Sequence, residues 1–322
     1  MSSPVFNAAL PRDRPSRTVP RVSIGLPVFN GARYLRGCLT SIIRQTFRDF
    51  ELVISDNASQ DETPAICQEL AARDARVRYV RNPTNIGIME NFAAVVGLAR
   101  GELFAWIGSD DIWDQGFLET LVEALDGSPD ASLACGNYDW IDDAGESRRL
   151  GSVQLARWAP KVAAPYLRLG GANGRLHNLC LYWWWRNPFP IYGLFRRASL
   201  IPLLPFEYLF ADCRHADNLM LLRFLLHHDL VVVDRVLFHY RLKEREFAGP
   251  GSYYAAGART DVPAATARPT TEERALLDRV LRAVEESTLS PVERGILRLA
   301  FPVLSRVRKG CASMKWHLRG SR

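Results

Sequence analysis

The stretch VSIGLPVFNG, residues 22–31, decides the fold class of the chain. A short run with β-branched residues predicts a strand over 22–29, and leucine and isoleucine then recur at helical spacing over 32–45. Further strands are predicted at 50–55, 77–81 and 103–107, with helices at 64–73 and 91–99 between them. This alternation, with its short links, predicts an α/β fold with a mostly parallel, Rossmann-like central sheet flanked by helices on both faces.

Polar residues gather where the four predicted strands end. The four ends read Pro27-Val28-Phe29-Asn30-Gly31, Ser55-Asp56-Asn57-Ala58-Ser59, Asn82-Pro83-Thr84-Asn85-Ile86-Gly87 and Ser109-Asp110-Asp111. Sheets of this kind bind ligands at the carboxyl ends of their strands. We therefore expect a polar binding site at one edge of the sheet. The sequence has neither GxGxxG nor a GxxxxGK[ST] loop, which argues against a dinucleotide dehydrogenase and a P-loop ATPase.

Asp110 and Asp111 form the sharpest polar feature of the sequence. Two adjacent carboxylates repel each other, so a protein that places both at a strand end usually supplies a cation. Oxygen ligands of this kind suit Mg²⁺ or Mn²⁺, typically shared with substrate phosphates. The alternative is that one of the two carboxylates caps a helix beginning near Gly116. Their position at the binding edge favours the metal interpretation.

Asp56, Asn85 and Gly87 each have a local and a functional interpretation. Asp56 is followed by Asn57-Ala58-Ser59, a context in which an aspartate often forms a turn with its own backbone. With Asp110 and Asp111 opposite, its carboxylate would instead accept hydrogen bonds from a base or a ribose. Asn85 and Gly87 match the common turn pattern Asn-Xaa-Gly, so they carry little information alone.

The positive charge of the chain is concentrated at its two ends. The 322 residues include 41 basic and 35 acidic side chains, a formal net charge of +6. Residues 291–322 hold eight basic residues and one acidic residue, and residues 1–22 hold four and one, which leaves −4 for the body. The basic balance therefore does not indicate a body that binds nucleic acid.

Composition also bears on the compartment and on membranes. A hydrophobic fraction of 48% and a charged fraction of 24% are ordinary for a globular protein and exclude a disordered or fibrous one. The six cysteines are scattered without CxxC spacing, which favours a reducing compartment. No apolar run reaches 18 residues and no signal segment is recognisable, so we expect no transmembrane helix and a cytoplasmic location.

Taken in order and spacing, the four strand-end motifs resemble the nucleotide-binding half of family 2 glycosyltransferases with the GT-A fold. The resemblance runs from Val22 to about Arg241. It implies an inverting glycosyltransferase of the hexosyltransferase type. Such an enzyme moves a single sugar from a nucleotide-diphosphate sugar, with UDP-sugar the first choice, to a glycan or lipid-linked acceptor. The usual setting of the family is the synthesis of bacterial surface polysaccharide.

The resemblance assigns roles to the matching positions of this sequence. It implies that the nucleotide-sugar donor is bound by residues from all four strand ends: Pro27, Phe29, Asn30, Asp56, Asn85, Gly87 and Asp110. Asp56 is implied to contact the base, and Asp110 to face the ribose or the sugar. Asp111, last of a DxD-like triplet, is implied to ligate Mn²⁺ or Mg²⁺ on the diphosphate, with His239 as a second metal contact. Ser109 stands where many relatives have the first acidic residue.

Inversion requires in-line attack by the acceptor hydroxyl, and therefore a general base opposite the leaving group. The family usually shows an acidic pair at the start of a helix after the donor half, followed by an apolar stretch with an arginine. Ala216-Asp217-Asn218 begins such a stretch here, with Ala216 in place of the first acid. Asp217 is therefore the predicted base. Its local alternative is a first-turn carboxylate favoured by the helix dipole, and Asp212 and His215 are further candidates.

Composition and the resemblance together divide the chain into segments. They are a flexible basic arm (1–20), a nucleotide-sugar-binding half (21–135), an acceptor-binding and catalytic-base half (136–247), a linker (248–270) and basic C-terminal helices (271–322). Trp183, Trp184 and Trp185 fit either an acceptor subsite or the core, because aromatic faces stack on sugars and also fill cores. Rival functions are a sugar nucleotidyltransferase and a non-catalytic scaffold that binds nucleotides or carbohydrates.

The last predicted helix has an apolar side next to basic residues. It begins with Ser290-Pro291-Val292-Glu293, which matches a capping box, and its apolar side comprises Val292, Ile296, Leu299, Val303 and Leu304. One interpretation is that this side packs on the body. The other is that the basic end docks on anionic lipid at the inner face of the membrane, near a lipid-linked acceptor.

Overall fold

The computed structural model describes residues 19–153, 166–169, 179, 189–204, 216–242 and 271–303. Four parallel strands form the first half of its central sheet: β1 (Val22–Val28), β2 (Phe50–Asp56), β3 (Val77–Arg81) and β4 (Leu103–Trp106). β1 lies between β2 and β4, and β3 pairs with the other side of β2. All four lie within one residue of their predicted ends, so the parallel α/β prediction is confirmed.

Helices connect these strands as the sequence pattern predicts. They are α1 (Ala32–Ile43), α2 (Thr63–Arg73) and α3 (Ile88–Leu98). The prediction that the third helix starts at Asn91 is wrong by one turn. Gly87 has a φ of 96°, a conformation that costs glycine little, and this lets the chain turn directly into the helix at Ile88.

The second half of the sheet mixes strand directions. Its strands are β5 (Ile112–Trp113), β6 (Ala131–Ile141), β7 (Ser147–Val153), β8 (Tyr166–Leu169), β9 (Leu194–Arg196) and β10 (Asp229–Arg241). The strand order is β3-β2-β1-β4-β9-β6-β10-β5, with β7 beside β6 and β8 beside β10. β9 is antiparallel to β4 and β6, whereas β10 runs parallel to β6. The sheet is therefore continuous across both halves, and β6 crosses the predicted boundary at residue 135.

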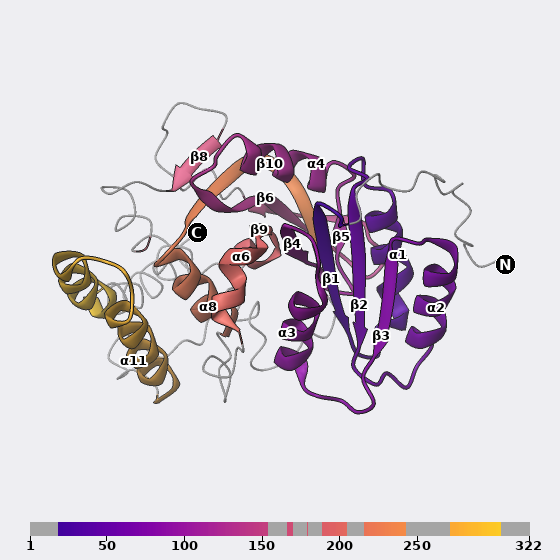
Figure 1. Ribbon diagram of the computed structural model, residues 1–322, viewed down its shortest axis with the longest axis horizontal. Helices are drawn as coiled ribbons and strands as arrows, with labels where there is room; N and C mark the ends of the chain where they lie inside the picture. Colours follow the sequence, from indigo (N-terminus) through magenta and orange to yellow (C-terminus); the bar gives the residue numbers. More distant parts are fainter. Residues whose placement is uncertain are drawn as a thin grey trace, which may run out of the picture.

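Helices cover both faces of this curled sheet (Figure 1). One core contains α1, α2 and α4 (Phe117–Asp126), and the other contains α3 and α8 (Ala216–Leu225). Alternate residues of one strand enter different cores: Leu103 of β4 packs in the first, and Phe104 and Trp106 pack in the second. Short helical segments flank β9, namely η2 (Phe189–Tyr192), α6 (Arg197–Leu200) and η3 (Ile201–Leu203).

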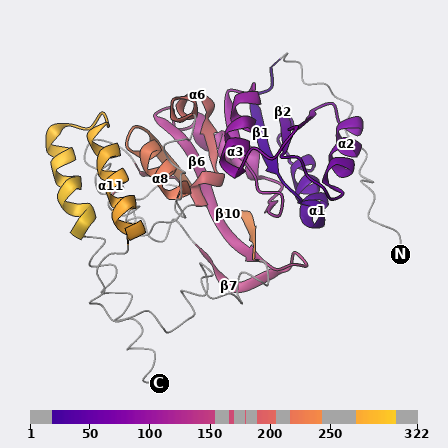
Figure 2. The ribbon, with the colours of Figure 1, turned by 90° about the horizontal axis from the view of Figure 1, so that it is seen from below.

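Two C-terminal helices form a further layer outside α8, namely α11 (Thr271–Glu285) and the helix 291–303 (Figure 2). The predicted capping box is confirmed, because Ser290 N donates to Glu293 Oε2 at 2.8 Å and Glu293 N donates to Ser290 Oγ at 3.3 Å. Within the described parts of the chain, no helix has both the length and the apolar character needed to cross a membrane.

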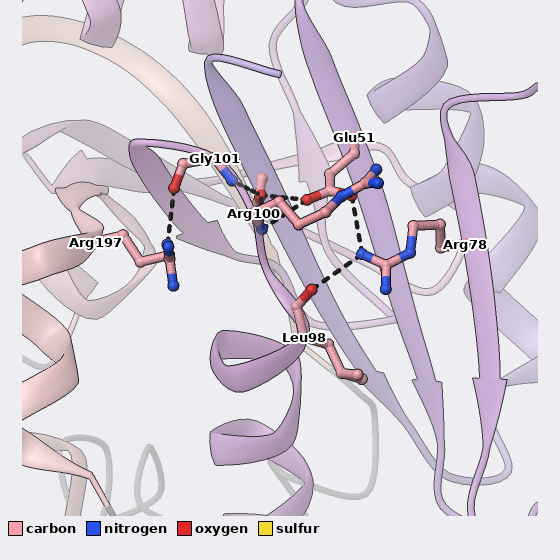
Figure 3. Close-up of polar contacts among 7 residues, drawn as sticks. Glu51, Arg78, Leu98, Arg100, Gly101 and Arg197 are labelled. Atoms are coloured by element: carbon pink, nitrogen blue, oxygen red, sulfur yellow. Dashed lines mark hydrogen bonds and ion pairs between the residues drawn. The ribbon is translucent and has the colours of Figure 1, made fainter. Parts of the chain in front are cut away.

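A buried carboxylate ties the amino ends of the parallel strands together (Figure 3). Glu51 of β2 is 2% exposed and accepts hydrogen bonds from Ser23 Oγ at 2.7 Å, Arg100 Nη2 at 2.7 Å and Arg78 Nη1 at 3.1 Å. Burial alone raises the pKa of Glu51, but the hydrogen bonds from Arg100, Ser23 and Arg78 outweigh it and lower the pKa below its usual value. This cluster lies at the edge opposite the strand-end motifs, where it holds the strands in register.

Replacing this carboxylate tests how much the register depends on it. We expect Glu51→Gln to lower the free energy of unfolding by about 2–4 kcal/mol, because two arginines lose their buried partner. The matched control is Glu69→Gln, whose carboxylate pairs with Arg36 and Arg73 at the surface and should change stability by less than about 0.5 kcal/mol. Urea unfolding of both variants measures the difference.

The difference in unfolding free energy between wild type and Glu51→Gln should also depend on pH in a direction that the pKa of Glu51 determines. A lowered pKa means that Glu51 contributes its full stability above the ordinary glutamate pKa of about 4.3. That contribution is lost as the pH falls through the lower pKa of the folded state. The gap between wild type and Glu51→Gln should therefore close in acid, and a gap that stays constant to pH 2 would contradict the assignment.

Candidate active site

The loops after β1, β2, β3 and β4 meet at one edge of the sheet. The register pairs Val28 with Asp56, and Asp56 with Arg81, so three strands end side by side. Backbone hydrogen bonds continue past the strand ends, from Asn57 N to Val28 O at 2.8 Å and from Asn82 N to Asp56 O at 2.8 Å. The predicted convergence of the strand-end motifs is thus confirmed.

Asp56 lies at the centre of this edge and is fully buried. Its Oδ1 accepts a hydrogen bond from Ser59 N at 2.9 Å, and its Oδ2 accepts one from Tyr79 Oη at 2.7 Å. Arg81 lies 3.6 Å from the same Oδ2. Burial raises the pKa of Tyr79, and the Asp56 carboxylate raises it further, so Tyr79 is a protonated donor at neutral pH. The local turn interpretation of Asp56 is therefore confirmed, and its contact with a base stays a prediction.

Asn57 organises the loop after β3, a role that the sequence did not indicate. Its Nδ2 donates to Asn85 Oδ1 at 2.8 Å and to Gly87 O at 3.0 Å, while its Oδ1 accepts from Ile86 N at 2.9 Å. Asn85 Oδ1 also accepts from Gly87 N at 2.9 Å. Asn85 and Gly87 therefore shape the loop before α3, in accordance with their turn interpretation.

Asn91 is a second asparagine that the sequence did not single out. It is 3% exposed on α3, and its Oδ1 accepts from Ser55 Oγ at 2.6 Å and from Asn82 Nδ2 at 3.2 Å. Its Nδ2 donates to Ser55 O at 3.0 Å. The amides thus join α3 to the ends of β2 and β3. In the sequence, such a residue can be recognised as a polar side chain at a position where the helix face is otherwise apolar, because a buried polar group needs hydrogen-bond partners.

The end of β1 combines a fixed backbone with an exposed ring. Pro27 is buried in the strand opposite Ser55, whereas Phe29 is 47% exposed. Asn30 has a φ of 50°, and its N donates to Ser59 Oγ at 2.9 Å. The loop after β1 is thereby joined to the loop after β2, with the Phe29 ring at the surface beside them.

The carboxylates of Asp110 and Asp111 converge near Gly108. A Cβ on Gly108 would lie 2.7 Å from Asp111 Oδ2 and 3.0 Å from Asp110 Oδ1, so a side chain at position 108 would displace the carboxylate oxygens. Cys38 Sγ lies 3.3 Å from Gly108 O. Burial raises the pKa of Cys38 well above its usual value, and the two carboxylates raise it further, which keeps the thiol protonated as a donor to this carbonyl.

Arg241 holds the acidic pair in place, and the sequence did not identify it. Its backbone N donates to Asp111 Oδ1 at 3.0 Å, and its Nε donates to Asp110 O at 2.7 Å. Nη1 donates to Asp142 O in the turn between β6 and β7, and the guanidinium lies 4.7 Å from the centre of the Tyr34 ring. The side chain is buried, so it joins three separate segments at the acidic pair.

His239 lies two residues before Arg241 on the same strand and pairs in register with Ile112, the residue after Asp111. Its Nδ1 lies 2.5 Å from Asp139 Oδ1 of β6. Metal-binding histidines commonly use one ring nitrogen in this way, with a carboxylate orienting the ring. Contact between His239 and a metal stays a prediction.

Asp217 is the second residue of α8 and is half-buried in the first turn of that helix. This confirms the predicted helix start, and the role as base stays a prediction. Asp212, His215 and the segment Trp183–Trp185 lie outside the described residues, as do the linker 248–270 and residues 1–18 of the predicted arm.

The acidic pair fits a metal that is shared with a substrate. Within the described residues, no group of three or more His, Cys, Asp and Glu side chains is arranged to hold a metal by itself. Two converging carboxylate oxygens nevertheless suit Mg²⁺ or Mn²⁺, which commonly take one or two protein carboxylates and fill the remaining positions with phosphate and water. The donor set therefore fits a cation carried on a diphosphate.

Comparisons with known sequences agree with this geometry. The family model described as glycosyl transferase family 2 matches residues 23–202. The glycosyltransferase GlyG of Streptococcus pneumoniae serotype 4 is 29% identical over 123 residues, which is 38% of this chain and 40% of GlyG. A chondroitin synthase of Escherichia coli is 35% identical over 119 residues, 37% of this chain and 17% of the synthase. The matches thus span less than half the length of these relatives.

Solved structures share the fold at lower identity. Residues 1–349 of S. aureus TarS in complex with UDP align with a TM-score of 0.59 and 17% identity, over 87% of this chain and 70% of that one. The mannosyltransferase PcManGT from Pyrobaculum calidifontis, in complex with GDP-Man and Mn²⁺, aligns with a TM-score of 0.55 and 16% identity, over 94% and 77%. The family match covers more than half of the chain and includes all four strand ends, and on this evidence the chain belongs to glycosyl transferase family 2.

Proposed function

We propose that this glycosyltransferase moves a single sugar from a UDP-sugar to a glycan or lipid-linked acceptor, with inversion at the anomeric carbon and with Mn²⁺ or Mg²⁺ on the diphosphate. The observation that carries the proposal is the convergence of Asp110 Oδ1 and Asp111 Oδ2 near Gly108, at the edge where β1, β2 and β4 end. Two solved relatives of the same fold hold UDP or GDP-Man, and one of them holds Mn²⁺.

In this proposal the nucleotide lies across the strand ends. Asp56 contacts the base, and Pro27, Phe29 and Asn30 border the pocket from the end of β1. Phe29 supports this role because it is 47% exposed, so its ring is available for packing against a planar ligand. Asn85 and Gly87 complete the pocket from the loop that Asn57 fixes. This is a preorganised site, since its loops are already joined by hydrogen bonds.

In this proposal, Asp110 and Asp111 bind the part of the donor that contains the diphosphate and its cation. Asp110 faces the ribose or the sugar, and Asp111, with His239, would hold the cation. A bound divalent cation stabilises the negative charge that develops on the leaving nucleoside diphosphate. Arg241 keeps both aspartates at fixed positions, because its backbone and side chain bind one carboxylate and one carbonyl of the pair. Asp139 Oδ1 lies 2.5 Å from His239 Nδ1 and orients the His239 ring.

Asp217 acts as the general base in this proposal. It takes the proton of the acceptor hydroxyl as that oxygen attacks the anomeric carbon from the face opposite the diphosphate. Its place in the first turn of α8 supports the role, because the helix dipole stabilises the ionised carboxylate that a base requires. The family match favours transfer over the sugar nucleotidyltransferase alternative.

A thermal-shift screen of nucleoside diphosphates with Mn²⁺ tests the donor site. At a hundredfold excess over its Kd, a cognate nucleotide adds about 2.7 kcal/mol of stability, which raises the midpoint measurably. We expect UDP to stabilise the protein with Mn²⁺ and to lose most of this effect with EDTA. Stabilisation by GDP and not by UDP would indicate a GDP-sugar as the donor. No stabilisation by any nucleotide would contradict the proposal.

Removing one charge from the acidic pair tests the metal role. Asp111→Asn retains the volume of the side chain and an acceptor for Arg241 N, so we expect the fold to persist. UDP affinity in Mn²⁺, measured by calorimetry, should fall by about a hundredfold or more, because a carboxylate ligand is lost. Asp114→Asn is the matched control, since Asp114 pairs with Arg235 and its variant should bind UDP like wild type. Equal affinity of Asp111→Asn and wild type would refute the role.

Neutralising the proposed base should separate binding from transfer. We expect Asp217→Asn to bind the UDP-sugar like wild type but to release UDP about 10²–10⁴ times more slowly, because proton removal is lost. Asp278→Asn on the exposed side of α11 controls for the loss of one carboxylate from a helix. Near-normal turnover of Asp217→Asn would exclude Asp217 as the base, and Asp212→Asn would then be the next variant to measure.

A further inference from the structure

The helix 291–303 has two apolar sides, and only one of them packs on the protein. Leu297 and Phe301 are fully buried in the core that also contains α8 and α11. The other side remains in solvent, with exposed fractions of 72% for Val292, 46% for Ile296, 75% for Leu299 and 54% for Val303. We call these four residues the C-terminal stripe. Both interpretations of this helix thus hold in part: it packs on the body, but through residues other than those of the stripe.

The C-terminal stripe is a continuous surface feature. Its members follow one another at intervals of four, three and four residues, which places them along one side of the helix. Single exposed apolar residues are ordinary, whereas an aligned row of them marks an interaction surface. In Figure 2 the helix forms the outermost layer beyond α8 and α11, far from β1 and β2, so the surface is separate from the candidate active site.

The charge next to the C-terminal stripe indicates which kind of partner this surface can bind. After the stripe the sequence continues with six basic residues and no acidic one, namely Arg306, Arg308, Lys309, Lys315, Arg319 and Arg322. Two nearby acidic side chains already pair with arginines: Glu285 with Arg298 at 2.9 Å and Glu286 with Arg223 at 2.9 Å. The sequence that follows the C-terminal stripe is therefore strongly basic.

We propose that the C-terminal stripe and the basic residues after it dock the protein on an anionic lipid surface. An apolar helix face supplies the part that enters the acyl boundary, and lysine and arginine supply attraction to negative headgroups. A second copy of the chain fits the surface less well, because self-association would bring two strongly basic segments together. This docking does not depend on the donor or on the base, so it stands apart from the proposed transfer reaction.

Vesicle sedimentation with the full chain tests the docking. We expect wild type to bind vesicles of phosphatidylcholine with 30% phosphatidylglycerol at least about tenfold more strongly than pure phosphatidylcholine, and to lose that difference in high salt. The double variant Val292→Glu/Leu299→Glu should lose about tenfold or more of this binding, since two inserted side chains become charged. Val19→Glu/Ile201→Glu adds the same charge at positions that are 49% and 47% exposed elsewhere, and should bind like wild type.

Measurements of folding, UDP binding and self-association distinguish loss of docking from other effects of the substitutions. The thermal midpoint and the UDP-induced shift of each variant show that the fold and the donor site are unchanged, so failure of docking is distinguished from failure of the proposed transfer. Replacing Arg306, Arg308 and Lys309 by Gln should weaken binding to anionic vesicles alone. Binding by Val292→Glu/Leu299→Glu at the wild-type level would overturn the proposal. So would lipid-independent dimers, seen by analytical ultracentrifugation, that this variant abolishes.

Discussion

Hydrogen bonds between β1 and its two parallel neighbours determine where the polar residues of the candidate site lie. Because the strands run in one direction and in register, their carboxyl ends coincide, and every loop that follows a strand emerges at the same edge. The buried Glu51 cluster secures the opposite ends of the same strands. The amino ends of the parallel strands are thus stabilised by an ion-pair network, and the ligand-binding loops lie at their carboxyl ends.

The second half of the sheet contributes to the site mainly through the end of β10. This strand places Arg241 beside Asp110 and Asp111 and places His239 beside the residue that follows them. Arg241 lies 130 residues after Asp111 in the sequence, and it also reaches the turn between β6 and β7. The Arg241 residue is buried, and its guanidinium donates to the main-chain carbonyls of Asp110 and Asp142.

The local patterns predicted well what depends on neighbouring residues. The strand ends and the capping box at Ser290 follow from β-branched runs and residue spacing, and both are confirmed. Residues that act across the chain were missed. Asn57, Asn91 and Arg241 have ordinary local contexts, and their importance arises from partners that only the fold brings close. The helix start at Ile88 was missed because nothing local reveals the φ of Gly87.

The sequence by itself determined the alternation of strands and helices, the polar strand ends and the concentration of positive charge at the two termini, because each is a property of consecutive residues. Tertiary structure decided which of these residues meet. It brought Arg241 beside Asp110, Asp111 and Asp142, and it turned Leu297 and Phe301 inward while leaving Leu299 in solvent. The physical reason is that periodicity identifies the apolar sides of a helix, whereas the partner available after folding selects the side that is buried.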